Sequence, residues 1–283
     1  FTMSLACGPI GLKANLAESI DLAAKHGFES VEPKTNELVA MSAAQLDELK
    51  ATLAAKKLQW GVTAVPADIR AATDADFEAS LKDAPKVCAA LQAVGASRVK
   101  TWIRPAHDSL TYLENFREHA ARIKRIGEVV GDYGIRFGIE YVGPKTSWTA
   151  ARHPFIHTMS EAMELLAATG RDNVGLVLDS WHWYCAEETA ADLLKLTNNN
   201  VVSCDLNDAP AGIPVQEQID QTRALPAATG VIDVKAFLNA LVQIGYDGPV
   251  QAEPFDKSLR EGTQEEAISR TAAAMKKAFA LIG

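Results

Sequence analysis

Short apolar segments alternate with longer amphipathic segments along the whole chain. The short segments hold four to six residues and are typical of buried strands. They lie at residues 3–6, 28–33, 58–63, 97–102, 135–140, 174–179, 201–206 and 248–253. The longer segments repeat apolar residues at helical spacing. They lie at residues 15–27, 43–57, 76–95, 112–134, 160–170, 188–196, 233–245 and 265–283. The pattern therefore predicts eight strand–helix units in series.

Strict alternation of strand and helix favours a parallel sheet, because parallel neighbours are joined by crossover helices. Eight such units in 283 residues fit a closed (β/α)8 TIM barrel, which we expect to form one domain over residues 1–283. An open doubly wound sheet is the alternative, and it commonly carries a GxGxxG motif after its first strand. Here that place reads CGPIGLKAN, with Gly8 and Gly11 but no third glycine at the helix start.

One long irregular segment, residues 207–231, follows the seventh predicted strand. Loops of this length inside a compact domain are commonly functional. In a barrel this loop would lie on the face where active sites are found.

Composition and charge narrow the class of partner. Hydrophobic residues make up 48% and charged residues 23% of the chain, as in ordinary soluble proteins. The net charge of −8 and the lack of a basic stripe disfavour a nucleic-acid partner. No apolar run is long enough to cross a membrane. We expect a cytoplasmic protein. The sequence begins with Phe1, so an export signal that has been removed is an alternative. A homo-oligomer is also an open alternative.

Cysteine usage points to free thiols. The four cysteines are too sparse for a disulfide scaffold, and no pair has the CxxC spacing of a structural zinc site. They are Cys7, Cys88, Cys185 and Cys204.

Charged side chains close most of the predicted strands. In chain order these are Glu32, Lys100, Glu140, Asp179 followed by His182, Asp205 with Asn207 and Asp208, and Glu253. The C-terminal ends of barrel strands meet around one axis, so at least three carboxylates would converge there. Carboxylates that lie so near to one another cannot all stay ionised unless a cation balances their charge. One divalent metal ion is the simplest balance, and oxygen ligands suit Mn²⁺, Mg²⁺ or Co²⁺ better than a thiolate-type zinc site.

Each of these residues also has a purely structural explanation. A single acid at a strand end can cap a helix or pair with a basic residue. Glu32 and Lys100 can pair with each other. His182 lies between Trp181 and Trp183, so it can be a buried histidine that donates to a backbone carbonyl.

Aromatic residues gather near the same strand ends, and Trp102 ends the fourth strand. Aromatic rings stack on the apolar face of a sugar, whose hydroxyl groups need polar partners. We therefore expect Trp102, Lys100 and Glu32 to face a sugar or keto-sugar. Lys145 follows Glu140 closely and can reach a substrate oxygen, or it can be a solvated loop lysine.

Five segments together resemble the xylose-isomerase-like TIM barrels, a superfamily of sugar isomerases and epimerases that also contains inosose dehydratases and apurinic endonucleases. The segments are GIEYVGPKT (138–146), LVLDSWHWY (176–184), VVSCDLNDAP (201–210), RALPAATGVIDVKAFLNALVQIGYDGPV (223–250) and QAEPF (251–255). The resemblance runs nearly end to end, but it does not specify the substrate.

The resemblance implies one divalent metal ion, held by Glu140, Asp179 and Glu253 together with a residue of the seventh strand. The family usually has a histidine at that last position, where this sequence has Asp205. Asp205 can still bind a metal through oxygen, which favours Mn²⁺ or Mg²⁺ and leaves Co²⁺ or Zn²⁺ as alternatives. It can also mean weak metal binding or a changed chemistry.

The resemblance further implies proton transfer at a carbon next to a carbonyl, with Glu140 and Glu253 as the catalytic groups. It implies that His182 contacts the substrate. Arg223 is a candidate for a distal hydroxyl or phosphate group, or it forms a salt bridge with a nearby acid.

Three functions stay open at this point. The first is a metal-dependent sugar or keto-polyol isomerase or epimerase. The second is a lyase or dehydratase that uses the same site. The third is a sugar-binding barrel without catalysis. An endonuclease is the least favoured reading, because the chain is acidic.

Overall fold

The computed structural model describes all residues from 1 to 283, and its main sheet is entirely parallel. The sheet order is β3-β2-β1-β11-β10-β9-β7-β5-β4. Its strands are β1 (Thr2–Leu5), β2 (Ser30–Val31), β3 (Gln59–Trp60), β4 (Thr63–Ala64), β5 (Arg98–Trp102), β7 (Arg136–Glu140), β9 (Val174–Asp179), β10 (Val201–Leu206) and β11 (Pro249–Ala252). Each predicted strand is therefore present, within one or two residues at most ends.

The third predicted strand closes the barrel. It is divided into β3 and β4, which are the two end strands in the sheet order. β3 pairs with β2, and β4 pairs with β5, so the two ends of the sheet meet in one stretch of chain. The division falls at Gly61, where an added Cβ would lie 2.5 Å from the Ser4 hydroxyl oxygen. The predicted (β/α)8 TIM barrel is confirmed, with nine strand segments forming eight barrel strands.

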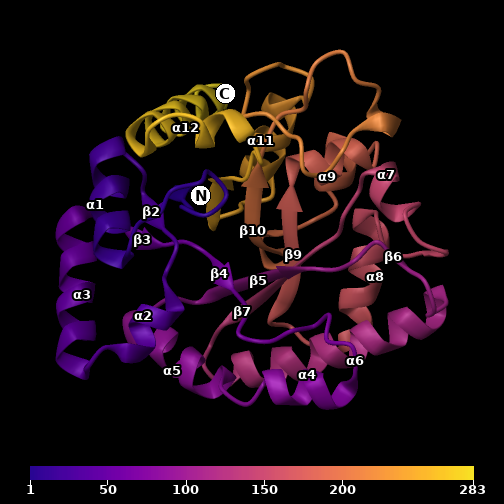
Figure 1. The fold of residues 1–283 in the computed structure, drawn as a ribbon, viewed down its shortest axis with the longest axis horizontal. Helices are drawn as coiled ribbons and strands as arrows, with labels where there is room; N and C mark the ends of the chain where they lie inside the picture. The colour runs from indigo at the N-terminus through magenta and orange to yellow at the C-terminus, as the bar shows by residue number, and fades with distance from the viewer.

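Helices surround the strands as an outer ring (Figure 1). They are α1 (Leu16–His26), α2 (Thr35–Ala40), α3 (Ala43–Lys56), α4 (Asp74–Ser80), α5 (Ala84–Val94), α6 (Tyr112–Gly131), α7 (Lys145–Trp148), α8 (Met159–Thr169), α9 (Ser180–Cys185), α10 (Ala190–Leu193), α11 (Val234–Gln243) and α12 (Gln264–Phe279). Three short 3₁₀ turns are η1 (Asn198–Asn200), η2 (Val215–Glu217) and η3 (Lys257–Arg260). A small antiparallel pair joins β6 (Ala106–His107) to β8 (His153–Pro154).

Two predicted helices differ from the structure. The segment 76–95 forms two helices, α4 and α5, because Pro85 suits a helix start and cannot continue a helix from before. The segment 188–196 is helical only over the four residues of α10. The other long helices have conventional ends, such as the capping box at Asn15 and the left-handed Gly27 that terminates α1.

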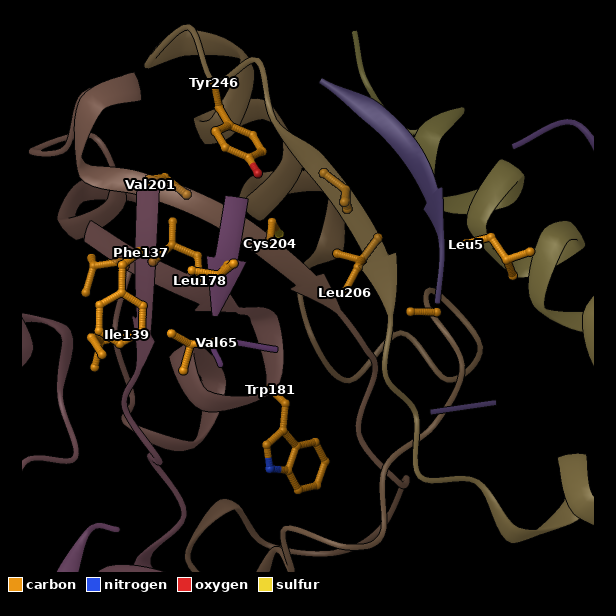
Figure 2. Packing of buried hydrophobic residues seen from close by; sticks show 14 of the residues in the cluster. Leu5, Val65, Phe137, Ile139, Leu178, Trp181, Val201, Cys204, Leu206 and Tyr246 are labelled. Carbon is orange, nitrogen blue, oxygen red and sulfur yellow. The ribbon is translucent and has the colours of Figure 1, made fainter. Parts of the chain in front are cut away.

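The apolar core lies between the strands and the helices. Alternate residues of a strand share a face. Phe137 and Ile139 on β7, with Cys204 and Leu206 on β10, belong to one buried cluster that faces the helices (Figure 2). The residues between them, such as Asp205, therefore point toward the barrel axis, as the alternation predicts.

All four cysteines are buried and free, as predicted. No helix has the combined length and hydropathy that crossing a bilayer would need.

Candidate active site

Four carboxylates meet at the C-terminal end of the barrel, one from each of four neighbouring strands. They belong to Glu140, Asp179, Asp205 and Glu253, and one oxygen of each lies within 4.8 Å of the others. Glu140 ends β7, Asp179 ends β9, Asp205 is the fifth residue of β10, and Glu253 follows β11. We call these four residues the acid cluster.

Two cationic side chains enter the acid cluster. The Lys100 amine, on β5, pairs with Asp205 and lies 3.9 Å from a Glu253 oxygen. The Arg223 guanidinium donates to Asp179 at 2.6 Å and to Glu253 at 3.2 Å. Arg223 comes from the long irregular segment 207–231, which lies between β10 and α11 at the upper right of Figure 1. Burial opposes both charges, but the surrounding acids, Asp205 for Lys100 and Asp179 for Arg223, raise each pKa above its usual range.

The acid cluster fits a divalent cation by charge and by donor type. Four carboxylates face two cationic groups, so two negative charges remain for one divalent ion to balance. Glu140 Oε1 and Asp205 Oδ1 are buried and have no hydrogen-bond partner. An unpartnered buried carboxylate oxygen is costly unless something binds it. Carboxylate oxygens are the ligands that hard divalent ions prefer.

The model of the xylose isomerase-like TIM barrels matches residues 20–278. The chain belongs to this family.

Inosose isomerases are among the relatives of the chain. The one from Bacillus velezensis is 25% identical over 262 residues, covering 90% of this chain and 89% of that protein. The one from Halalkalibacterium halodurans is 30% identical over 148 residues. That match spans about half the length of the relative, 49%. A 3-dehydroshikimate dehydratase of Pseudomonas aeruginosa is 23% identical and matches 91% of this chain but 39% of its own length.

Solved structures of the family share the whole fold. A xylose isomerase domain protein from Alicyclobacillus acidocaldarius is 26% identical, with a TM-score of 0.85 over 99% of this chain and 98% of that one. An IOLI protein solved with a zinc atom is 21% identical, with a TM-score of 0.78 over 98% and 96% of the two chains.

Burial raises the pKa values of all four carboxyl groups of the acid cluster. The pKa of Glu140 is well above its usual range because of burial and because Glu253 and Asp205 lie close. The pKa of Asp179 is raised by burial to about 6, although Arg223 opposes the rise. Burial also raises the pKa values of Asp205 and Glu253 against the lowering effect of Lys100.

His182 lies beside the acid cluster as a neutral ring. Burial, followed by the nearby Arg223 charge, lowers its pKa to about 3. Both ring nitrogens face N–H groups, because the Gly143 amide donates to Nδ1 at 3.3 Å and Arg223 Nη2 lies 3.3 Å from Nε2. Nε2 faces single oxygens of Glu140, Asp179 and Asp220, each 3.9 Å away. His182 therefore lies at the acid cluster, and its role there stays a prediction.

Asp179 combines a structural and a site role through its two oxygens. Oδ1 accepts from the Trp181 amide at 2.7 Å and from the Asn207 side chain at 2.9 Å, which caps α9 and ties β9 to β10. Asn207 also accepts from the Glu253 amide at 3.0 Å. Oδ2 remains for Arg223 and the acid cluster. The helix-capping explanation is therefore correct for this residue, and its second oxygen lies in the acid cluster, where its predicted metal-binding role stays a prediction.

Three further predicted residues lie at the rim of the site. Glu32 is half-buried, and its pKa is raised by burial against Lys34 and Lys100. It does not pair with Lys100, whose partners are in the acid cluster. Trp102 is 43% exposed. Lys145 is exposed at the start of α7, and it forms no ion pair.

The remaining aromatic residues divide into core and site. Trp181 is fully buried, Trp183 packs against Phe237, and Tyr141 donates to Glu188 at 2.6 Å. These rings are therefore packing residues. Phe255 lies against the Arg223 guanidinium, 4.7 Å from its ring centre, and is part of the mouth.

Sequence reasoning missed two residues that hold the site in place. Asp220 accepts from Arg223 at 2.8 Å, and its position three residues earlier was the available signal. Gly143 packs so closely that an added Cβ would lie 2.3 Å from the His182 carbonyl oxygen. Asp208, by contrast, turned out to be structural, because it accepts only from amides such as those of Thr229, Gly230 and Ile232.

Proposed function

We propose that the chain is a divalent-metal-dependent isomerase or epimerase of a sugar or keto-polyol, which moves a proton on a carbon next to a carbonyl. The observation that carries this proposal is the pair Glu140 and Glu253, whose carboxylate oxygens lie within 4.8 Å of each other at the end of the barrel and whose pKa values are both raised by burial. The inosose isomerases among its relatives support the same class of reaction.

Glu140, Asp179, Asp205 and Glu253 would hold the ion. All four donors are carboxylates, which favours Mn²⁺ or Mg²⁺ and leaves Co²⁺ or Zn²⁺ as alternatives. When bound, the ion supplies Lewis acidity for a substrate carbonyl.

Glu140 and Glu253 approach the site from different sides. Their strands, β7 and β11, are separated in the sheet by β9 and β10. One glutamate can therefore remove a proton from one face of a substrate carbon while the other returns a proton to the opposite face. Such an exchange between faces is what an epimerase requires.

His182 and Arg223 suit the binding of substrate oxygens. His182 stays neutral in the physiological pH range, because burial lowers its pKa to about 3, and its Nε2 lies at the acid cluster. Arg223 holds Asp179 and Glu253 in place and stays charged. Glu32, Lys100, Trp102 and Lys145 remain candidates for contacts with the rest of the sugar.

Proton exchange in D₂O tests the proposal. The Mg²⁺-loaded protein is incubated with a panel of ketoses and keto-polyols, and NMR follows the C–H signals next to the carbonyl. We expect exchange with at least one compound, and a loss of at least about 100-fold in Glu140→Gln and Glu253→Gln, as for removal of a general base. Glu261→Gln, an exposed glutamate, is the matched control. Full metal binding with no exchange in any compound would contradict the proposal.

A lyase or dehydratase is the second candidate, favoured by the match to a 3-dehydroshikimate dehydratase over most of this chain. It begins with the same proton removal and then expels a substituent from the neighbouring carbon. The same NMR experiment separates the two reactions, because a lyase yields a new C=C signal and a released leaving group.

A further inference from the structure

A second polar pocket lies apart from the acid cluster, between helix α6 and the loops that follow β4 and β5. Its volume is about 380 Å³. We call it the arginine pocket. The residues that define it are Arg70, Arg104, His107, Asn115, His119 and Arg122.

Three buried side chains of α6 that line this pocket carry unpartnered polar atoms. Asn115, His119 and Arg122 are 2%, 6% and 4% exposed. Asn115 Oδ1, His119 Nε2 and Arg122 Nε have no hydrogen-bond partner in the protein. Buried polar atoms are nearly always satisfied, so three unpartnered atoms on residues that line one cavity indicate a polar occupant.

The three unpartnered atoms are two hydrogen-bond acceptors and one donor. His119 Nδ1 donates to the Asn115 carbonyl at 3.0 Å, so Nε2 of the neutral ring is an acceptor. Asn115 Oδ1 is a second acceptor, and the Arg122 Nε–H is a donor. Hydroxyl groups of an occupant would satisfy the two acceptors, and an oxyanion would satisfy the donor.

The charge in the arginine pocket is unbalanced. Arg122 pairs with Glu118 at 2.9 Å and with Asp74 at 3.0 Å. Arg70 and Arg104 have no carboxylate partner in the structure. Arg70 instead donates to the Trp102 carbonyl at 2.6 Å and lies over the Trp102 ring. The only acid in the pocket wall is Glu118.

The neighbouring groups respond to this excess of positive charge. Burial, opposed by the hydrogen bond to Asn115, and then the charge of Arg122 lower the pKa of His119 to about 4. Burial also lowers the pKa of Arg70, opposed by Asp68, and the neighbouring Arg104 lowers it further. An anion in the pocket would offset the part of each shift that comes from the neighbouring arginine.

We propose that the arginine pocket binds a small polyhydroxylated molecule that carries an oxyanion, either a phosphate or a carboxylate. Guanidinium groups present paired N–H donors that match both oxyanions. The volume is that of a small-molecule site. The pocket shares no residue with the acid cluster, so this inference stands independently of the proposed function.

Calorimetry on the full chain, freed of metal by a chelator, tests the proposal. The probes are glucose 6-phosphate, gluconate, inorganic phosphate and glucose. We expect at least one of the two polyol anions to bind at least about tenfold more tightly than glucose and than inorganic phosphate. The identity of that probe distinguishes a phosphate ester from a sugar acid.

Three variants locate the binding. Arg104→Met should weaken the binding of that probe at least about fivefold. Arg117→Met, an exposed arginine of the same helix, changes the net charge equally and should leave binding unchanged. Asp179→Asn should also leave it unchanged, because the acid cluster is not involved. The proposal is overturned if no polyol anion binds, if inorganic phosphate binds equally well, if both arginine variants weaken binding alike, or if Asp179→Asn abolishes it.

Discussion

The acid cluster and the arginine pocket each gather several charged groups of one sign, but they are built on different elements, and of the three arginines only Arg122 is buried. Each carboxylate of the acid cluster stands at the end of a different strand, held by a parallel ladder. The arginine pocket takes Asn115, His119 and Arg122 from one face of α6, with the remaining groups on loops. Its geometry therefore depends on how one helix docks and how two loops fold.

The two regions also balance their charge differently. Lys100 and Arg223 neutralise half of the acid cluster from within, where water is excluded. The acids that pair with Arg122 are partly in water, since the Asp74 side chain is 88% exposed. A buried cluster of this kind holds reacting groups in fixed positions, whereas a partly hydrated pocket suits binding and release.

Replacing the buried arginine of each region should show the difference between the two regions most clearly. Arg223→Met leaves the fully buried Asp179 without its cationic partner, and should cost about 3–5 kcal/mol of unfolding free energy in the metal-free protein. Arg122→Met should cost less, because Asp74 and Glu118 can be hydrated once the guanidinium is gone. Urea unfolding of both variants checks this. Equal costs would contradict the distinction between the two regions.

Glu188 is a half-buried acid that no cation balances, and its effect on stability depends on pH. Burial raises its pKa to about 7 from 4.5, although Tyr141 and the Met159 amide donate to it. Between pH 4.5 and 7 the folded state binds more protons than the unfolded state, so stability falls as pH rises. The total loss is at most about 3 kcal/mol.

The matched variant is Glu188→Gln, which keeps an acceptor for the Met159 amide and cannot ionise. The stability of wild type relative to this variant should decline between pH 4.5 and 7.5, as measured by urea unfolding at several pH values. Parallel stability curves for the two proteins would show that Glu188 does not hold its proton in the folded state.

The sequence predicts the acid cluster in large part, and it predicts the arginine pocket much less well. The acid cluster could be predicted because Glu140, Asp179 and Glu253 close strands, and a barrel brings strand ends together whatever its loops do. The orientation of Asp205 followed from strand alternation. Arg223 could be predicted only as a candidate, because its place depends on the path of the long loop.

The arginine pocket was not predicted, although it left a signal. Asn115, His119 and Arg122 follow one another at helical spacing on the face of α6 that turns out to be buried. Polar residues on a buried helix face indicate a polar cavity, but the pattern cannot say what lies opposite. The loop residues Arg70 and Arg104 come close only once β4 and β5 are paired.

Removing one carboxylate should abolish metal binding without affecting the arginine pocket. Asp179→Asn keeps a side chain that can cap α9, so the fold should survive. It should weaken Mn²⁺ binding by at least about 100-fold, which is about 2.7 kcal/mol. Calorimetry with Mn²⁺ measures this, and elemental analysis of protein purified without chelator supports it. Unchanged metal affinity would exclude Asp179 as a ligand.

Replacing Lys100 should have the smallest of these effects, and it should strengthen metal binding where Asp179→Asn weakens it. Its amine pairs with one oxygen of Asp205, Oδ2, and lies close to Glu253, so it competes with a metal ion for two of the proposed ligands. Lys100→Met removes this competing charge at similar length, and should strengthen Mn²⁺ binding by about tenfold, or about 1.4 kcal/mol.

The control for this prediction is Lys100→Arg, which keeps a positive charge at the same strand position. Its Mn²⁺ affinity, measured by the same calorimetry, should stay within a few-fold of wild type, since a guanidinium pairs with carboxylates as an amine does. Weaker binding in Lys100→Met would mean that the amine organises Asp205 for the metal instead of competing with it. In that event the acid cluster would need its internal cations to bind an ion, and the excess negative charge alone would not explain its affinity.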